Sequence, residues 1–149
     1  MIPKVIHYCW FGGNPLPEEA KRCIESWKKY CPDYKIIEWN ENNYDVNSNE
    51  YMKAAYKEKK WAFVSDYARI DVVYKCGGIY MDTDVELVKE LDTFLNNRMY
   101  CGWEMRDPLL DKLGRNYENS VAFGLGFGAE KGHPALKQIL DLYDRISFY

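Results

Sequence analysis

The chain has 149 residues, with 20 Lys and Arg against 23 Asp and Glu, so its formal net charge is -3. A chain of this length forms one domain and needs no disulfide or structural metal to fold. The two signs of charge are interspersed, which argues against a nucleic-acid-binding surface. Five cysteines without a C-x-x-C pair fit neither a zinc site nor a secreted disulfide framework. With no signal peptide and no long apolar run, the sequence favours a soluble protein of the reducing cytosol.

The first third of the chain predicts a strand, a helix and a second strand. Residues 5–11 form an apolar strand that ends at the glycines and prolines of residues 12–17. A helix with acidic residues in its first turn follows and stops at Cys31-Pro32. Residues 34–39 predict the next strand. A glycine loop directly after a strand is a common edge of a ligand site.

The middle of the chain predicts two helices and a third strand. Residues 50–60 form a lysine-rich, exposed helix, and residues 61–74 form a more apolar one, with Gly77 placed to cap its end. The strand that leads to Asp82 follows directly. This alternation predicts an α/β fold with a mostly parallel central sheet flanked by helices. In such sheets ligands bind beyond the carboxyl ends of the strands, where Asp82 and Asp84 fall.

The C-terminal third is less regular. Residues 85–88 and 99–103 predict short strands, and residues 107–119 a polar loop. Residues 121–129, with three glycines, predict a strand that other backbone approaches closely. A last amphipathic helix begins at His133-Pro134 and reaches Tyr143. No repeat or linker divides the chain, so residues 1–149 are expected to form a single domain.

Two carboxylates one residue apart, Asp82 and Asp84, end the third predicted strand. Carboxylate oxygens are preferred ligands of Mg²⁺ and Mn²⁺, and a site with only two of them leaves positions open for substrate phosphates. The pattern therefore predicts a metal site for chemistry on a phosphate ester. The alternative is a solvated turn, where an Asp-x-Asp triplet arises often by chance.

Ser65, Asp66 and Arg69 share one face of the preceding predicted helix, because positions three and four apart are neighbours. Arg69 suits bidentate pairing with a phosphate or with sugar hydroxyls, and Asp66 suits orienting Arg69 or accepting from a hydroxyl. The alternative is an ordinary surface ion pair. Trp10, before the double glycine, is either a core residue or a flat face for stacking on a nucleobase.

The two histidines, His7 and His133, are too few for a multi-histidine zinc site and poor candidates for a Ser-His-Asp triad. His7 lies within the first apolar strand and is expected to be a core histidine with its hydrogen bonds satisfied. His133 is expected at the start of the last helix.

Four segments together resemble glycosyltransferase family 32. They are residues 2–13 (IPKVIHYCWFGG), 62–69 (AFVSDYAR), 77–84 (GGIYMDTD) and 128–134 (GAEKGHP). This is the sugar-binding, DXD-motif group that includes capsular polysaccharide transferases and yeast-type mannosyltransferases and is related to clostridial glucosylating toxins. The resemblance spans most of the chain. It implies a GT-A fold, a UDP- or GDP-hexose donor, Mn²⁺ or Mg²⁺, and retention of anomeric configuration.

The resemblance also implies roles for matching residues. Asp84 is implied as the direct metal ligand, and Asp82 as a contact to metal, ribose or donor sugar. Asp66 and Arg69 are implied to hold the donor sugar and diphosphate, with Ser65 beside them. The catalytic candidates are the four charged residues Asp66, Arg69, Asp82 and Asp84.

Trp10 and a glycine pair complete the implied donor site. By resemblance Trp10 lies against the base, and Gly77 and Gly78 let the backbone approach the donor. The metal acts as a Lewis acid on the diphosphate, and transfer passes through an oxocarbenium-like state stabilised in part by Arg69. No second carboxylate is evident as a nucleophile, so we expect the acceptor hydroxyl to attack from the same face.

Two other functions stay open from the sequence. A haloacid dehalogenase-type phosphohydrolase also carries Asp-x-Asp after an apolar strand, but there the motif belongs to the first strand. The other alternative is a non-catalytic module that binds a nucleotide sugar or carbohydrate. Family members generally continue beyond the last helix, so the chain is either a short member or a fragment truncated at its C-terminus.

The expected partners follow from the resemblance. They are a nucleotide-sugar donor and a saccharide or lipid-linked saccharide acceptor, as in polysaccharide biosynthesis, with no nucleic acid. A cytoplasmic location with peripheral contact at the inner face of a membrane is compatible with such an acceptor, although no basic amphipathic helix requires it. The sequence fixes neither the sugar, the nucleotide nor the oligomeric state.

Overall fold

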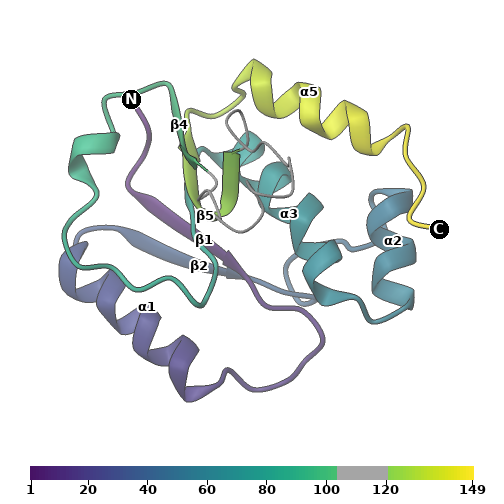
Figure 1. The fold of residues 1–149 in the computed structure, drawn as a ribbon, viewed down its shortest axis with the longest axis horizontal. Helices are drawn as coiled ribbons and strands as arrows, with labels where there is room; N and C mark the ends of the chain where they lie inside the picture. Colours follow the sequence, from purple (N-terminus) through teal and green to yellow (C-terminus); the bar gives the residue numbers. More distant parts are fainter. Residues whose placement is uncertain (104–120) are drawn as a thin grey trace, which may run out of the picture.

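The computed structural model describes residues 1–103 and 121–149 and is built on a five-stranded sheet of order β2-β1-β3-β5-β4 (Figure 1). The strands are β1 (Val5–Cys9), β2 (Lys35–Trp39), β3 (Gly78–Tyr80), β4 (Met99–Trp103) and β5 (Val121–Ala129). The helices are α1 (Glu18–Tyr30), α2 (Glu50–Lys57), α3 (Trp61–Cys76) and α5 (Pro134–Tyr143), with a 3-10 turn, η1, at Asp92–Phe94. The polar loop predicted for residues 107–119 lies outside the described residues.

The sheet has a parallel half and an antiparallel half. β1 runs parallel to both β2 and β3, with Ile6 opposite Ile36 on one side and Ile79 on the other. β5 runs antiparallel to β3 and to β4. The parallel half confirms the predicted alternation of strands and helices, and it brings the carboxyl ends of β1, β2 and β3 to one edge of the sheet.

Each face of the sheet buries its own core. Ile6, Tyr8 and Ile79 belong to a buried cluster with Trp27 of α1 on one face. Tyr80 belongs to the other cluster, together with residues of α2, α3 and α5. Ile79 and Tyr80 therefore point to opposite faces, as successive residues of a pleated strand do. Figure 1 shows α1 on one side of the sheet and α3 with α5 on the other.

The strand predicted for residues 85–88 is wrong, because that segment lies along α1 without joining the sheet. The indole Nε1 of Trp27 donates to the carbonyl of Val85 at 2.8 Å, and the hydroxyl of Ser26 accepts from the N–H of Leu87 at 2.9 Å. Val85 and Leu87 are half-buried, whereas the residues between and after them are exposed. Packing on a helix thus produces the same alternation that a half-buried strand shows.

Helix ends differ slightly from the predictions. α2 ends at Lys57 rather than residue 60, and Lys59 takes a left-handed φ of 58° in the turn before α3. α3 continues two residues beyond the predicted end, and Gly77, with φ of 70°, follows it as predicted. Asn49 caps α2 by accepting from the N–H of Met52 at 3.0 Å. α5 has the predicted bounds.

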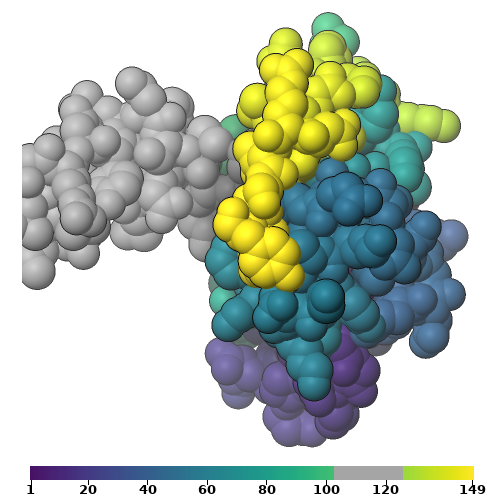
Figure 2. Space-filling model, turned by 90° about the vertical axis from the view of Figure 1, so that its right-hand side faces the viewer, coloured from purple at the N-terminus to yellow at the C-terminus, as the bar shows by residue number. Residues whose placement is uncertain are grey.

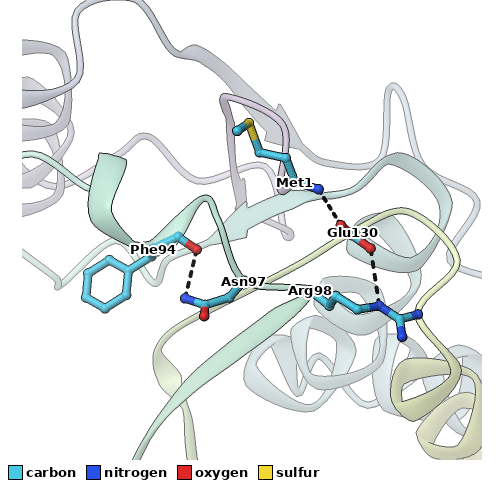
Figure 3. A network of polar contacts seen from close by, with 5 residues as sticks. All are labelled: Met1, Phe94, Asn97, Arg98 and Glu130. Atoms are coloured by element: carbon cyan, nitrogen blue, oxygen red, sulfur yellow. Dashed lines mark hydrogen bonds and ion pairs between the residues drawn. The ribbon is translucent and has the colours of Figure 1, made fainter.

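The N-terminus is tied to the far side of the sheet (Figure 3). Glu130, directly after β5, forms ion pairs with the amino group of Met1 and with Arg98, whose Nε lies 3.5 Å away. Nearby, the side chain of Asn97 donates to the carbonyl of Phe94 at 3.1 Å. These contacts join the segment before β1 to the ends of β4 and β5, on the side away from the carboxyl ends of the parallel strands.

The C-terminal residues pack against α2 and the start of α3 (Figure 2). The ring of Phe148 lies edge-on to Phe63 at 5.6 Å and to Tyr51 at 5.6 Å, and Tyr149 donates to Glu58 at 3.1 Å. Within residues 1–103 and 121–149, no helix has the length and apolar character needed to cross a membrane.

Candidate active site

A cavity of about 410 Å³ opens at the carboxyl ends of β1 and β3, against the N-terminal half of α3. It holds six of the eight predicted site residues: Trp10, Ser65, Asp66, Arg69, Asp82 and Asp84. The rest of its wall is made by Cys9, Phe11, Asn14, Trp61, Ala62, Tyr80 and Thr83. The fold therefore brings three separate sequence motifs to one hollow, as expected for the carboxyl edge of a parallel sheet.

The two aspartates of the Asp-x-Asp motif sit in a tight turn at the lip of this cavity. Pairing of β3 with β1 ends where the N–H of Met81 donates to the carbonyl of His7 at 3.1 Å. The carbonyl of Asp82 then accepts from the N–H of Val85 at 3.1 Å, which closes the turn. Asp82 is half-buried and Asp84 is exposed. The motif is thus in a turn, as the alternative supposed, but in one that borders the cavity.

Tyr80, the last residue of β3, holds the carboxylate of Asp82 by a hydrogen bond. Its hydroxyl donates to Asp82 Oδ1 at 2.7 Å, and its ring is 1% exposed. Burial raises the pKa of Tyr80 well above its usual value, so the hydroxyl stays a donor. Burial also raises the pKa of Asp82, and the nearby Asp84 and Asp66 carboxylates add to this effect against the opposing pull of Tyr80 and Arg69. Three carboxylates therefore crowd a partly dry site.

Arg69 supplies a positive charge among these carboxylates. Its guanidinium lies 3.4 Å from Asp66 Oδ1 and 5.9 Å from the centre of the Tyr80 ring. The Nε of Arg69 is buried and has no hydrogen-bond partner within residues 1–103 and 121–149. Burial raises the pKa of Asp66, although Arg69 opposes this. The side chain of Arg69 is 18% exposed and that of Asp66 is 36% exposed, so this pair is more enclosed than an ordinary surface ion pair.

Ser65 and Trp10 face the same cavity from two different elements. Ser65 lies one residue before Asp66 on α3, and Trp10 follows the end of β1. The indole Nε1 of Trp10 donates to the carbonyl of Asn14 at 2.7 Å, which closes the loop between them. Trp10 is only partly buried, so one part of its ring remains open to a ligand.

Gly77 and Gly78 do not line the cavity. They lie at the opposite end of β3, where a Cβ on Gly78 would meet the carbonyl oxygen of Val5 at 2.7 Å and His7 Nε2 at 2.9 Å. A Cβ on Gly77 would meet the N–H nitrogen of Lys131 at 2.9 Å. Close approach is required there, but the groups that approach are those of this chain, from β1 and from the segment after β5.

Both histidines have structural roles, as predicted. His7 is fully buried, with Nε2 at 2.8 Å from the carbonyl of Gly77 and Nδ1 accepting from the indole of Trp39 at 3.0 Å. His133 caps α5 by accepting from the N–H of Ala135 at 3.1 Å. Neither lines the cavity.

Comparison with known protein families identifies the family of this chain. Residues 17–100, more than half of the chain, match the family model described as "Glycosyltransferase sugar-binding region containing DXD motif". The chain belongs to this glycosyltransferase family. The matched segment contains Ser65, Asp66, Arg69, Asp82 and Asp84, and the resemblance to DXD-motif sugar transferases seen in the sequence is confirmed.

Two curated relatives extend over nearly the whole chain. Inositol phosphoceramide mannosyltransferase 3 of Schizosaccharomyces pombe is 30% identical over 99% of this chain and 38% of its own length. An uncharacterised glycosyltransferase of Acanthamoeba polyphaga mimivirus is 29% identical over 93% of this chain and 54% of its own length. The chain thus spans about half or less of the length of these relatives.

A solved structure confirms the fold. The PaToxG glycosyltransferase superposes with a TM-score of 0.66 and 22% identity, over 95% of this chain and 60% of that one. At this identity the likeness concerns the fold alone, and it agrees with the predicted GT-A-type α/β architecture.

Proposed function

We propose that this family member transfers a hexosyl unit from UDP- or GDP-hexose to a saccharide or lipid-linked saccharide acceptor, with retention of configuration and with Mn²⁺ or Mg²⁺. The observation that carries the proposal is one cavity that gathers Asp82, Asp84, Asp66, Arg69 and Trp10. Carboxylates for a cation, a guanidinium for phosphate and an aromatic face for a base are the groups that a nucleotide-sugar donor requires.

The donor set of the cavity fits a hard divalent cation. Asp82 and Asp84 would hold it, and among the residues described no three His, Cys, Asp or Glu side chains are arranged to bind a metal ion by themselves. A Mg²⁺-type ion commonly binds one or two protein carboxylates and takes substrate phosphates and water for the rest. Burial is the main cause of the raised pKa of Asp82, and the Asp66 and Asp84 carboxylates that add to it also favour a cation there. When bound, the cation supplies Lewis-acid stabilisation of the diphosphate leaving group.

Arg69 is the residue best placed to hold the diphosphate. Its buried Nε has no partner in the described part of the chain, and a phosphate oxygen is the acceptor that a guanidinium fork prefers. The guanidinium then adds positive charge where the leaving phosphate gains negative charge. Asp66, 3.4 Å away, orients the guanidinium and offers an oxygen to the hydroxyls of the donor sugar.

Retention is proposed to proceed by attack on the same face of the sugar. The bond from the anomeric carbon to the phosphate oxygen breaks as the bond to the acceptor oxygen forms, and the acceptor proton passes to the leaving phosphate. Asp66, which lines the cavity, is an alternative nucleophile, but its ion pair with Arg69 makes it a poorer one. Mass spectrometry of the enzyme with a slow donor analogue tests this step, and a hexosyl adduct on Asp66 would replace same-face attack with a double displacement.

The acceptor class is proposed from the name of one relative. That relative is an inositol phosphoceramide mannosyltransferase. A lipid-linked acceptor would bring this chain to a membrane surface, and we propose a cytoplasmic protein with peripheral membrane contact on that basis. The phosphohydrolase alternative loses its support, because the Asp-x-Asp motif follows the third strand of a chain that belongs to a glycosyltransferase family. A donor-binding module without turnover is the second candidate.

Calorimetric titration of UDP and GDP, with and without Mn²⁺, tests the site. We expect one nucleotide to bind only with Mn²⁺, and binding to be lost in Asp84→Ala. Glu86→Gln is the matched control, since Glu86 is an exposed acid two residues on and outside the cavity. Product formation from the matching sugar nucleotide separates the transferase from the non-catalytic module. Failure of both nucleotides to bind would refute the proposed donor site.

A further inference from the structure

The loop after β1 separates two cavities. Trp10 and Asn14 line the 410 Å³ cavity described above and also a second one of about 540 Å³. The second cavity lies beside β2 and the turn that follows it. It is lined there by Glu38 and Glu41, and by Tyr56 of α2. The backbone N–H of Trp10 donates to the carbonyl of Trp39 at 2.9 Å, and beyond that contact the position of Trp10 depends on what holds this loop in place.

The carboxylate of Glu41 holds the loop after β1 in place. Glu41 Oε2 accepts from the backbone N–H of Gly12 at 2.7 Å and from the hydroxyl of Tyr56 at 2.9 Å. Burial raises the pKa of Glu41, but the hydrogen bonds from the backbone N–H groups of Gly12 and of Glu41 itself and from the hydroxyl of Tyr56 outweigh it, so the pKa lies below the usual value. A charged oxygen that accepts two hydrogen bonds forms a stronger anchor than a neutral acceptor.

The backbone conformation and close neighbours of Gly12 leave little room for another path of this loop. Its φ is 101°, a conformation that glycine adopts readily, and a Cβ there would meet the ring of Trp61 at 2.7 Å. Trp61 in turn lies edge-on to Tyr56 with ring centres 5.2 Å apart. Gly12 is thus enclosed between the Trp61 ring and the Glu41 carboxylate, with Tyr56 touching both.

We infer that Glu41 is a positioning residue for the donor site, which acts by fixing the loop of Gly12 so that Trp10 stands at the edge of the catalytic cavity. This inference rests on the proposed function, because it assigns the fixed Trp10 face to the nucleotide donor. Glu41 does not line the catalytic cavity, so it works through the loop. Fixing the loop in advance reduces the ordering cost of donor binding.

The first measurement needs no nucleotide. Amide hydrogen exchange at Gly12 reports the anchor directly, and we expect it to quicken at least about tenfold in Glu41→Ala, because a hydrogen bond to a charged acceptor is lost. Tyr56→Phe removes one of the two donors and should give a smaller increase. Glu38→Gln is the matched control, because Glu38 lines the same second cavity but bonds Tyr8 and Asn40 instead. Unchanged exchange at Gly12 in a folded Glu41→Ala protein would overturn the inference.

The second measurement asks whether Glu41 acts through Trp10. The dissociation constant of the nucleotide diphosphate with Mn²⁺ is measured for wild type, Glu41→Ala, Trp10→Ala and the double variant. We expect Glu41→Ala to weaken binding about tenfold in the wild-type background and to have little further effect once Trp10 is absent. An equal loss in both backgrounds would show that Glu41 acts independently of Trp10, against the inference. If wild type binds no nucleotide, the proposed function fails along with the donor role, while exchange at Gly12 still decides whether the anchor exists.

Discussion

Between pH 7.5 and 5.5, a fall in pH should destabilise this fold through His7. In the folded protein both ring nitrogens are used: Nε2–H donates to the carbonyl of Gly77, and Nδ1 accepts from Trp39. A second proton has to go on Nδ1, where it would face the indole N–H. Burial accordingly lowers the pKa of His7 below its ordinary value of 6.5, despite the opposing hydrogen bond to Gly77. The unfolded chain therefore binds the proton more readily than the folded one.

The sign and size follow from proton linkage. A histidine with a lowered folded pKa contributes full stability above the unfolded pKa and loses it as pH falls toward the folded pKa. One such group costs up to about 1.4 kcal/mol at one pH unit below the unfolded value. Asp66 and Asp82, whose folded pKa values are raised, act in the opposite direction but are present in wild type and variant alike.

Urea unfolding from pH 7.5 to 5.5 of wild type and His7→Gln measures this contribution. We expect His7→Gln to be less stable at pH 7.5, because it disturbs two buried hydrogen bonds. The difference between the two proteins should narrow by up to about 1.4 kcal/mol at the acid end. A constant difference across this range would mean that His7 takes up its proton as easily folded as unfolded, and the hydrogen-bond assignment would be wrong.

Two further substitutions probe β3 from its two ends. Tyr80→Phe removes the hydroxyl that donates to Asp82. We expect the fold to be retained and the cation-dependent nucleotide affinity, measured by calorimetry, to fall about tenfold or more. Unchanged affinity would make Tyr80 a packing residue only. Gly78→Ala places a methyl group 2.7 Å from the carbonyl of Val5 at a φ of 122°, so thermal unfolding should show a loss of about 3 kcal/mol. Gly13→Ala, with a φ of 75° and open space around it, is the control and should lose about 1–2 kcal/mol.

Local patterns predicted most of the charged side chains that line the 410 Å³ cavity. Asp66 and Arg69 are three residues apart on a helix, and Asp82 and Asp84 directly follow a strand, so each pair is readable from a short segment. Their meeting followed from the alternation of strands and helices, which places the carboxyl ends of parallel strands at one edge. Tyr80 was missed, although Tyr80 and Asp82 are two apart at the end of a strand and so fall on the same side.

Residues that depend on the path of a loop were not predictable in the same way. Glu41 reaches Gly12 across 29 positions of sequence, and the contact exists because β1 and β2 are neighbours in the sheet. Trp61 was expected only to begin a helix, yet its ring fills the space beside Gly12. Gly78 was assigned to donor binding because a glycine pair permits close approach, but a sequence does not say which neighbour approaches. In this fold the neighbour is the backbone of β1.

Three charged side chains that line the 410 Å³ cavity, Asp66, Arg69 and Asp82, lie in unfavourable surroundings in the unliganded protein. Burial raises the pKa values of Asp66 and Asp82, repulsion from Asp84 and Asp66 adds to the rise for Asp82, and the Nε of Arg69 is buried without a partner among the described residues. Each of these costs free energy in the unliganded protein. A divalent cation with a diphosphate would relieve both, because it neutralises the carboxylates and gives the guanidinium an acceptor. The residues that weaken the free protein are therefore the same ones that would give the complex its stability.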